Sequence, residues 1–377
     1  MNSLYQKILY KGYALIENML FKHFSFFTKK NTLLLVRLDS IGDYILFRNF
    51  IQELKNSDKY KNYKITLCGN SWWKDLAENL DAPCIDKFIW VDYSKLLEEK
   101  YKFQLYKKIF LSGFETVISP VYARDINSDN LIKYSGARHR IGYLGDTSNL
   151  SQEIKEHNNA FYTELIATSY TYRFEFYRNK DFFESLLHQS LPIHKPSINK
   201  KQEEKNQILF FPGAKDAFRR WSSANFARLA NRLNKVYPGF EIWVCGSSSD
   251  SNMAAEIIKD AGVPVQDRTG KYSLVQLLDI ISQSKLIVGN DSGPFHLSVA
   301  LNRNVICISN GNNYGKFTPY PVEMKTKSIV LYPQQILSYN EEERLHKFHR
   351  MVSDVNINDI TVDDVFSTII THFKITA

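Results

Sequence analysis

The feature that most constrains the fold of this chain is an alternation of short apolar runs with helical patterns, which occurs twice in 377 residues. Residues 33–36 form a continuous apolar run, as a strand buried on both faces requires. Similar runs follow, and helical stretches separate most of them, which is typical of a parallel sheet with crossover helices. In this first series we expect a helix at 44–54 and strands at 33–36, 65–68, 88–91, 116–119 and 139–141.

A polar linker separates this series from a second one. Residues 161–189 are aromatic with a helical pattern, Pro192 and Pro196 follow, and residues 200–206 contain almost nothing apolar. Beyond the linker we expect strands at 208–211, 242–245, 286–288 and 305–308, and helices at 226–237, 253–260, 273–284, from Pro294 onward and at 362–373.

The length of the chain and the position of the linker predict two domains. We place them at residues 1–200 and 201–377, with the last helix either in the second domain or returning to the first. Both domains should be α/β and Rossmann-like, and such domains bind ligands outside the carboxyl ends of their strands. Two of them joined by a linker predict a binding cleft between the domains.

Composition and charge narrow the classes of partner. The net charge of +8 and the pI near 9.0 suit phosphate groups, acidic glycans, anionic lipid or nucleic acid. The sequence contains no zinc finger, RNP-like motif or basic heptad helix, so we do not expect nucleic acid as a partner. The four cysteines lie far apart without a CxxC pair, which predicts no zinc site, no disulfide framework and a reducing cytoplasm as the location.

The start of the chain, residues 4–27, reads as an amphipathic helix. Its aromatic and aliphatic residues fall on one side, and Lys7, Lys11 and Lys22 fall on the other. A basic, aromatic helix of this kind fits an anionic membrane surface and fits equally a place against its own domain. No run of residues approaches the ~20 apolar residues that span a bilayer, and we expect no secretory signal.

A glycine-bearing loop follows the first expected strand and reads Arg-Leu-Asp-Ser-Ile-Gly-Asp at residues 37–43. Gly42 permits a tight entry into the next helix, and Asp43 falls at or near the N-terminus of that helix. Aspartate is favoured there as a helix cap without any chemistry. From these residues alone we prefer the cap to a catalytic role.

Cations are concentrated in the loop that follows the strand at 208–211. Gly213, Lys215 and Arg219 lie there between a strand and the N-terminus of a helix. Fixed cations, backbone N–H groups and the helix dipole can together hold a diphosphate. The alternative, that these are solvated surface cations, stays open at this point.

A third loop, residues 289–296, combines small, turn-forming and ionisable residues. Pro294 suits the first turn of a helix, and the backbone N–H groups of Ser292 and Gly293 are placed for an anion. Asp291 and His296 flank them. The chain has no Walker A loop and no G-x-G-x-x-G after the first strand, which argues against kinases and simple dehydrogenases.

Taken together, the three loops resemble the heptosyltransferase family of lipopolysaccharide biosynthesis, glycosyltransferase family 9. The opening pattern of that family, an apolar strand followed by Arg-Leu-x-x-x-Gly-Asp, is matched at residues 33–43. Its Pro-Gly loop ending in a basic residue and Trp is matched at 211–221, and its Gly-Asn-Asp-Ser-Gly-Pro-x-His-Leu signature at 289–297. Residues 135–142 resemble a further block. The aromatic N-terminal helix and the Tyr- and Phe-rich middle of the chain depart from the family pattern.

The resemblance implies a GT-B fold and an inverting glycosyltransferase that needs no metal ion. It implies no cofactor besides a nucleotide-sugar co-substrate, with ADP-heptose as the expected donor. Asp43 would then be the general base on the acceptor hydroxyl, Arg219 would neutralise the leaving diphosphate, and the Asp291–His296 loop would bind it. Asp250, after the strand at 242–245, lies where a residue that contacts the ribose is expected.

The implied acceptor is an anionic glycolipid or glycan at the inner face of the cytoplasmic membrane. Four arginines of the first domain are candidates to meet its negative charges, with ordinary surface charge as the alternative for each: Arg48, Arg124, Arg138 and Arg140. Two other functions remain open, a nucleotide-sugar epimerase of GT-B type and a non-catalytic scaffold that binds nucleotide sugars.

Overall fold

The structure, a computed structural model, describes residues 28–200, 202–349, 352–373 and 375. The helix expected over residues 4–27, and with it the choice between a membrane surface and its own domain, lies outside the described residues. The chain divides into two compact units. The first unit consists of Met1–Ser169 and Arg178–Pro192, and the second consists of Tyr170–Tyr177 and Ile193–Ala377.

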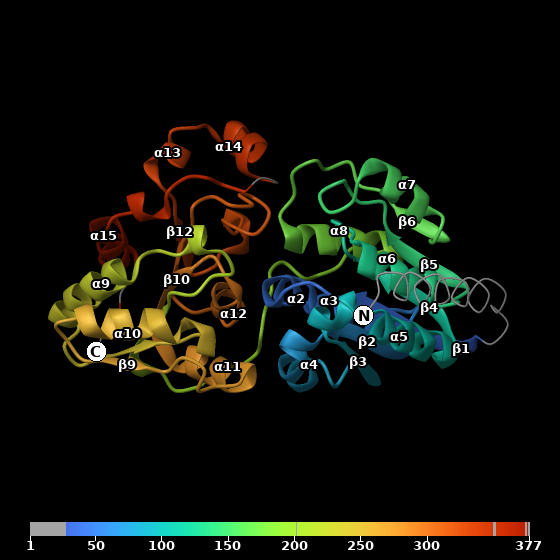
Figure 1. Ribbon diagram of the computed structural model, residues 1–377, viewed down its shortest axis with the longest axis horizontal. Coiled ribbons are helices and arrows are strands. Elements are labelled where there is room, and N and C mark those ends of the chain that lie inside the picture. The colour runs from blue at the N-terminus through green and yellow to red at the C-terminus, as the bar shows by residue number, and fades with distance from the viewer. Residues whose placement is uncertain (1–27, 201, 350–351, 374, 376–377) are drawn as a thin grey trace, which may run out of the picture. The chain divides into compact units, whose positions relative to one another are not determined.

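The first unit is built on a six-stranded parallel sheet with helices around it (Figure 1). The strands, in the spatial order β3-β2-β1-β4-β5-β6, are β1 Lys29–Arg37, β2 Lys64–Asn70, β3 Lys87–Val91, β4 Phe114–Ser119, β5 His139–Tyr143 and β6 Glu164–Ile166. The helices are α2 Ile41–Phe47, α3 Asn49–Asn56, α4 Lys74–Leu80, α5 Glu99–Ser112, α6 Ile126–Lys133, α7 Gln152–Asn159 and α8 Glu175–Leu187, of which residues 175–177 belong to the second unit. The centre of β1, residues 33–36, is completely buried, as its continuous apolar run predicted.

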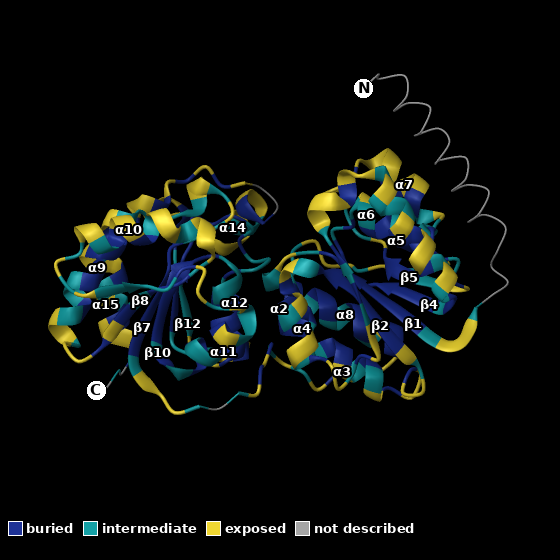
Figure 2. Cartoon of the chain, turned by 60° about the horizontal axis from the view of Figure 1, so that its bottom comes forward, coloured by how far each residue is buried: buried dark blue, intermediate teal, exposed yellow. Residues whose placement is uncertain are grey.

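The second unit repeats this architecture. Its strands, in the spatial order β12-β11-β10-β7-β8-β9 and again parallel, are β7 Lys205–Phe211, β8 Glu241–Val244, β9 Val265–Asp267, β10 Ser284–Asn290, β11 Val305–Ile308 and β12 Ser328–Leu331. Its helices are α9 Ser223–Val236, α10 Ser251–Asp260, α11 Leu274–Gln283, α12 Gly293–Ala300, α13 Gln334–Leu337, α14 Glu341–Phe348 and α15 Val362–His372. Figure 2 shows buried strands in the middle of each unit and helices whose outer sides are exposed.

Both sheets have the same strand order when each is counted from its own first strand: 3-2-1-4-5-6. This is the Rossmann order, in which the direction of winding reverses between the first and the fourth strand. The switch point lies between β1 and β4 in the first unit and between β7 and β10 in the second. The expected α/β class with two Rossmann-like sheets is confirmed, and the ligand-binding edge of each sheet is the carboxyl end of these strands.

The C-terminal helix packs within the second unit. α15 contacts α9, and its residues Val365 and Ile369 are buried in the same core as Leu229 of α9. The indole N–H of Trp221 donates to the carbonyl oxygen of Ile360 at 2.8 Å, just before α15. This helix therefore completes the core of the second unit.

The expected elements were wrong in two places. The single helix expected over 44–54 is divided at Arg48 into α2 and α3, with an i to i+3 hydrogen bond from Ile51 N to Arg48 O at 3.0 Å. The helical pattern over 161–189 forms a helix only from Glu175, because residues 164–166 pair with β5 as an edge strand. Pairing with the preceding strand overrides local periodicity at such positions.

Candidate active site

The loop after β1 presents Asp43 in the first turn of α2. Ser40 caps this helix, and the Asp43 carboxylate accepts the backbone N–H of Ser40 at 3.3 Å, which completes a capping box. The predicted cap role is therefore confirmed. The side chain of Asp43 is partly exposed at the carboxyl edge of the sheet. Its role as general base stays a prediction.

Buried side chains from two other elements hold this loop. Arg37, the last residue of β1, is fully buried; its Nε lies 2.8 Å from Asp39 Oδ1, and its Nη1 lies 2.8 Å from Asn179 Oδ1. At the end of β2, the amide of Asn70 donates to the loop backbone at 3.0 Å, and the indole of Trp73 donates to the Asp39 carbonyl at 2.9 Å. Sequence reasoning missed these supporting residues, although Asn70 ends a buried strand and Trp73 lies three residues beyond it.

Two of the four candidate acceptor arginines have carboxylate partners. Arg124 is 1% exposed, with Nη2 3.0 Å from Asp129 Oδ2 and Nη1 2.8 Å from Asn159 Oδ1. Arg48 binds Asp81 Oδ1 at 2.7 Å. These guanidinium groups connect helices of the first unit to one another, so the structure assigns both arginines a part in the packing of this unit.

The other two arginines lie at the opposite edge of the first sheet. Arg140 is the second residue of β5 and pairs with Val117 of β4, which in turn pairs with Leu34 of β1. Asp43, in contrast, follows the carboxyl end of β1. Three strand residues correspond to roughly 10 Å, and Asp43 lies further along still. The exposed Arg138 precedes β5. The structure thus does not bring the four arginines together around Asp43.

In the second unit, the structure brings Arg219 and Asp291 into contact although 72 residues separate them. Arg219 Nη2 donates to the Asp291 carbonyl oxygen at 2.6 Å and lies 3.1 Å from Asp291 Oδ2. The strand register explains this contact: Phe211 at the end of β7 lies beside Gly289 of β10, so the two following loops start at the same level. The pair stands at the switch point of the sheet, where ligands of Rossmann-like units bind.

Asp291 is buried, whereas the side chain of Arg219 is partly exposed with only its Nε atom buried. Burial raises the pKa of the Asp291 carboxyl, and the neighbouring guanidinium of Arg219 offsets part of this rise. Within the described part of the chain, the buried Nε–H of Arg219 finds no acceptor. A buried donor without a partner costs about 1–3 kcal/mol, so this group is suited to an anionic oxygen.

His296 lies on the first turn of α12 and is 4% exposed. Its Nδ1 is 2.9 Å from the hydroxyl oxygen of Tyr320. Burial lowers the pKa of His296 to about 3, and the positive charge of Arg219 contributes in the same direction. The imidazole is therefore neutral at physiological pH, which suits it to hydrogen bonding and to positioning rather than to supplying a positive charge.

Asn290, which sequence reasoning did not single out, connects the two loops. Its side chain is fully buried, donates to the Pro212 carbonyl at 2.6 Å and accepts the Trp221 backbone N–H at 3.1 Å. The loop that carries Arg219 is thus fixed at both ends by one residue of the neighbouring loop. The sequence could have indicated this residue, because Asn290 ends a buried strand and directly precedes Asp291.

Asp250 and Gly213 also lie together. A Cβ atom at Gly213 would be 2.5 Å from Asp250 Oδ1, so any larger residue here would force this carboxylate to move. Ser247 holds the carboxylate, with its backbone N–H at 2.8 Å and its hydroxyl at 2.7 Å from Oδ2. Asp250 follows β8, on the other side of β7 from Asp291.

The remaining predicted donor residues are at the same edge. Lys215 is exposed in the loop after β7. Ser292 is the N-cap of α12, Gly293 is the first helical residue and Pro294 the second. The first N–H groups of a helix have no intrahelical acceptor and carry the positive end of the helix dipole. These residues can therefore bind a phosphate group beside Arg219.

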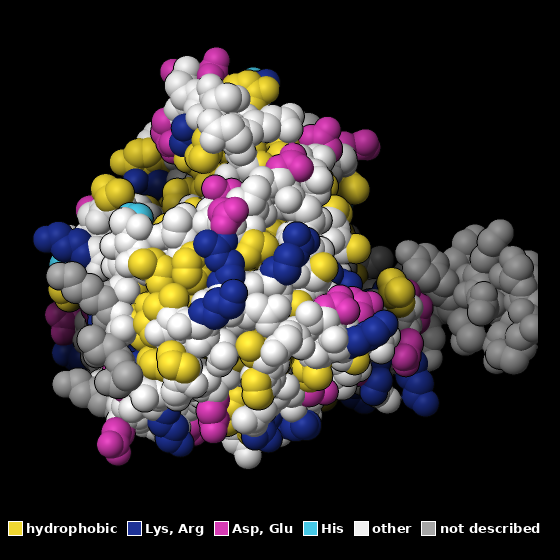
Figure 3. Space-filling view, turned by 90° about the vertical axis from the view of Figure 1, so that its left-hand side faces the viewer, with side chains coloured by type: hydrophobic (Ala, Val, Ile, Leu, Met, Phe, Trp, Pro, Cys, Tyr) yellow, Lys and Arg dark blue, Asp and Glu magenta, His cyan; other side chains and the backbone are white. Residues whose placement is uncertain are grey.

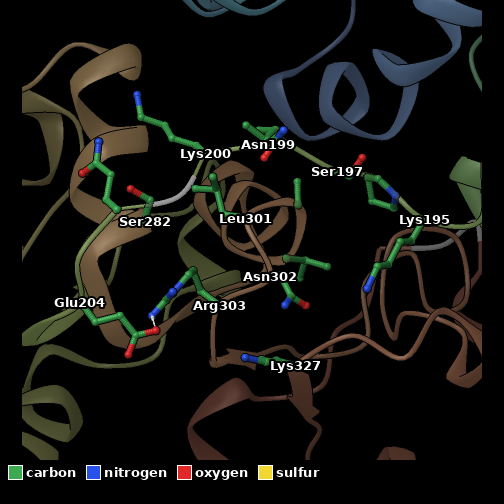
Figure 4. Close-up of a pocket in the computed structure, with 15 residues that line it drawn as sticks. Lys195, Ser197, Asn199, Lys200, Glu204, Ser282, Leu301, Asn302, Arg303 and Lys327 are labelled. Atoms are coloured by element: carbon green, nitrogen blue, oxygen red, sulfur yellow. Dashed lines mark hydrogen bonds and ion pairs between the residues drawn. The ribbon is translucent and has the colours of Figure 1, made fainter. Parts of the chain in front are cut away.

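A cavity of about 590 Å³ lies at the opposite edge of the second sheet. Figure 4 shows Lys195, Arg303 and Lys327 around it, with Arg303 paired to Glu204 at 2.6 Å. Its lining contains none of the predicted donor residues.

On the face shown in Figure 3, basic side chains are interspersed with acidic and apolar ones. The basic side chains on that face therefore do not form a single continuous basic patch.

The described residues contain neither a cluster of metal ligands nor a membrane-spanning helix. In residues 28–200, 202–349, 352–373 and 375, no three His, Cys, Asp or Glu side chains are grouped so that they would hold a metal ion. None of the helices in these ranges combines the length and the apolarity needed to cross a bilayer.

Comparison with known proteins shows what this geometry resembles. The family model described as glycosyltransferase family 9 (heptosyltransferase) matches residues 105–349. Lipooligosaccharide heptosyltransferase 2 of Haemophilus influenzae is 23% identical over 352 residues, which are 84% of this chain and 93% of that protein.

Two solved structures share the fold. The E. coli heptosyltransferase WaaC with ADP has a TM-score of 0.68 at 14% identity and covers 90% of this chain and 99% of its own. The E. coli ADP-heptose lipopolysaccharide heptosyltransferase II has a TM-score of 0.65 at 18% identity, with 89% and 96% covered. The fold is therefore that of the GT-B class. The family match is equally plain: the chain belongs to glycosyltransferase family 9, the heptosyltransferases, and the predicted family is confirmed.

Proposed function

We propose that this protein is an inverting, metal-independent glycosyltransferase that transfers heptose from ADP-heptose to a lipopolysaccharide core or a related surface glycan. The observation that carries the donor half of this proposal is the arrangement around Arg219. A buried Nε–H without an acceptor lies at the switch point of the second sheet, beside the N-terminus of α12. This combination fits the two phosphate groups of a nucleotide sugar.

The donor site is preorganised. Asp291 holds Arg219 through its carbonyl oxygen and its carboxylate before any ligand arrives, so little reorganisation accompanies the reaction. The Asp291 carboxylate also cancels part of the positive charge, which makes the α12 N-terminus and Lys215 necessary for binding a diphosphate. We assign the contact with the ribose to Asp250, which follows β8 on the other side of β7 from Asp291.

The chemical step uses Asp43 of the first unit. The acceptor hydroxyl gives its proton to the Asp43 carboxylate, and its oxygen attacks the anomeric carbon with inversion. The bond from that carbon to the phosphate oxygen breaks, and the electron pair leaves with the diphosphate, whose charge Arg219 stabilises. We place this reaction in the cytoplasm, at the inner face of the membrane, where an anionic glycolipid acceptor would expose its sugars.

The substitution Asp43→Asn tests the general base. Asparagine keeps an oxygen that can accept the Ser40 N–H, so α2 should remain capped. We expect the transfer rate to fall by roughly 10²- to 10⁴-fold, with unchanged thermal stability and unchanged affinity for ADP-heptose. The matched control is Asp364→Asn, which changes the same capping-box position in α15, where Asp364 Oδ2 accepts the Thr361 N–H at 2.9 Å. Undiminished transfer by Asp43→Asn would remove this residue from the mechanism.

The donor is tested by a thermal-shift screen against ADP-, UDP-, GDP- and CMP-linked compounds. A ligand that binds only the folded state raises its stability by RT ln(1 + [L]/Kd). Selective stabilisation by ADP compounds is the expected result, and selectivity for another base would refute ADP-heptose. Product analysis without acceptor distinguishes transfer from epimerisation, because an epimerase would convert the nucleotide sugar alone.

A further inference from the structure

The Tyr- and Phe-rich middle of the chain, which departs from the family pattern, contains a segment that belongs to the second unit. Residues 170–177 lie between parts of the first unit in sequence but cluster with the second. The backbone N–H of Glu175 donates to the Lys316 carbonyl at 2.8 Å, and the ring of Phe174 lies 4.9 Å from that of Tyr320. The segment is therefore anchored to the loop that follows β11.

This segment and the loop after β11 enclose a cavity of about 430 Å³. Its volume falls in the range of roughly 300–1,000 Å³ that is typical of small-ligand pockets. Five of the twelve residues that line it are aromatic, and one is a cation: Tyr172, Phe174, Tyr177, Tyr314, Tyr320 and Arg173.

The aromatic rings are held in fixed orientations. Three tyrosine hydroxyls bind side chains of the second unit: Tyr177 with Glu323 at 2.9 Å, Tyr314 with Glu341 at 2.8 Å and Tyr172 with His346 at 3.2 Å. Phe174, Tyr314 and Tyr320 are buried, whereas Tyr172 and Tyr177 are partly exposed. These two fixed rings can meet a ligand at little cost in conformational entropy. Tyrosine also combines an apolar face with a polar edge, as does a sugar ring.

The cavity lies beside β11, on the side of the donor site where we expect the sugar of the nucleotide donor. In the sheet order β11-β10-β7-β8, the diphosphate residues follow β10 and β7, and Asp250 follows β8. A nucleotide with its ribose near Asp250 and its diphosphate beside Arg219 therefore directs its sugar toward β11. Tyr320, which lines the cavity, is hydrogen-bonded to His296 of α12, so one side chain separates the cavity from the diphosphate-binding helix.

We propose that this cavity binds a sugar ring of the substrates, stacked on the partly exposed rings of Tyr172 and Tyr177. The inference rests on the proposed glycosyltransferase function and adds a site for carbohydrate on the β11 side of the second unit. The ring has two sources, the sugar of the nucleotide donor and a sugar of the acceptor glycan, and both present the same C–H face to the tyrosines.

Two substitutions at Tyr177 separate stacking from hydrogen bonding. Tyr177→Ala removes the ring, whereas Tyr177→Phe keeps the ring and removes only the hydroxyl bound to Glu323. Tyr237→Ala is the matched control, because Tyr237 is also half-buried in the second unit but lies at the opposite sheet edge, before β8. The full-length variants are compared in thermal stability, in Kd for ADP and for ADP-heptose, and in KM for the acceptor.

We expect Tyr177→Ala to weaken sugar binding about two- to tenfold, as the loss of one aromatic contact does, with Tyr177→Phe close to wild type. A higher Kd for ADP-heptose with an unchanged Kd for ADP identifies the donor sugar. A higher acceptor KM with both Kd values unchanged identifies an acceptor sugar. If Tyr177→Ala changes neither quantity more than Tyr237→Ala does, the sugar site is refuted. A wild-type protein that binds no ADP compound refutes the proposed function instead.

Discussion

Replacement of His296 by asparagine should reduce the loss of stability that the protein undergoes in mild acid. The imidazole is buried, and burial lowers its pKa from 6.5 to about 3. At pH 5 the folded protein therefore keeps His296 neutral, whereas the same residue in the unfolded chain takes up a proton. Protonation of the unfolded state alone favours unfolding.

The sign and size follow from the two pKa values. Because the folded-state pKa is the lower one, the stabilising contribution is fully present above pH 6.5 and is lost as the pH falls toward 3. One pKa unit corresponds to about 1.36 kcal/mol, and pH 5 is about 1.5 units below the unfolded pKa. The loss at pH 5 is then about 2 kcal/mol, and it hardly depends on how far below 5 the folded pKa lies.

The assay is equilibrium unfolding in urea at pH 7.5 and pH 5.0. Asparagine places an amide near the position of Nδ1 and can keep the hydrogen bond to the Tyr320 hydroxyl. We expect wild type to lose about 2 kcal/mol more than His296→Asn between the two pH values. Substitution of His372, which is exposed on α15, should leave the wild-type behaviour unchanged. Equal losses in wild type and His296→Asn would refute the buried, neutral imidazole.

Two further predictions concern stability and donor binding. Gly213→Ala should lower the free energy of unfolding by about 1–3 kcal/mol and weaken ADP-heptose binding, because its Cβ would lie 2.5 Å from Asp250 Oδ1. Gly262→Ala, whose nearest atom would be 3.6 Å away, should leave both properties unchanged in urea unfolding and calorimetric titration. Arg124→Ala should cost about 3–5 kcal/mol, because it leaves a buried carboxylate without its partner, whereas the exposed Arg138→Ala should change stability by no more than about 0.5 kcal/mol. Similar urea midpoints for the two arginine variants would contradict the packing role of Arg124.

The elements that the sequence predicted well are those whose signal is local. The run at residues 33–36 required burial on both faces, and it forms the centre of β1. The edge strands β6, β9 and β12, of three or four residues each, were not predicted. Such short segments contain too few residues for a periodic pattern, and they become strands because a neighbouring strand offers hydrogen-bonding partners.

The candidate site divides in the same way. The three loops were predicted from strand ends and turn-forming residues, and the cap at Asp43 was predicted from the preference of aspartate for helix N-termini. The sequence could not distinguish Arg124 from Arg138, because a buried and an exposed arginine have the same local pattern. Their different places come from Asp129 and the packing around it, which only the folded chain provides.

By itself the sequence determined the alternation of strands and helices, the position of the glycine-bearing loops and the family to which they belong, because these depend on residues close together in the chain. Only the tertiary structure decided that β7 lies beside β10, so that Arg219 meets Asp291 across 72 residues, and that residues 170–177 join the second unit. The physical reason is that strand order and burial are set by the combined packing of distant segments. A local sequence pattern does not show which distant segments will pack together.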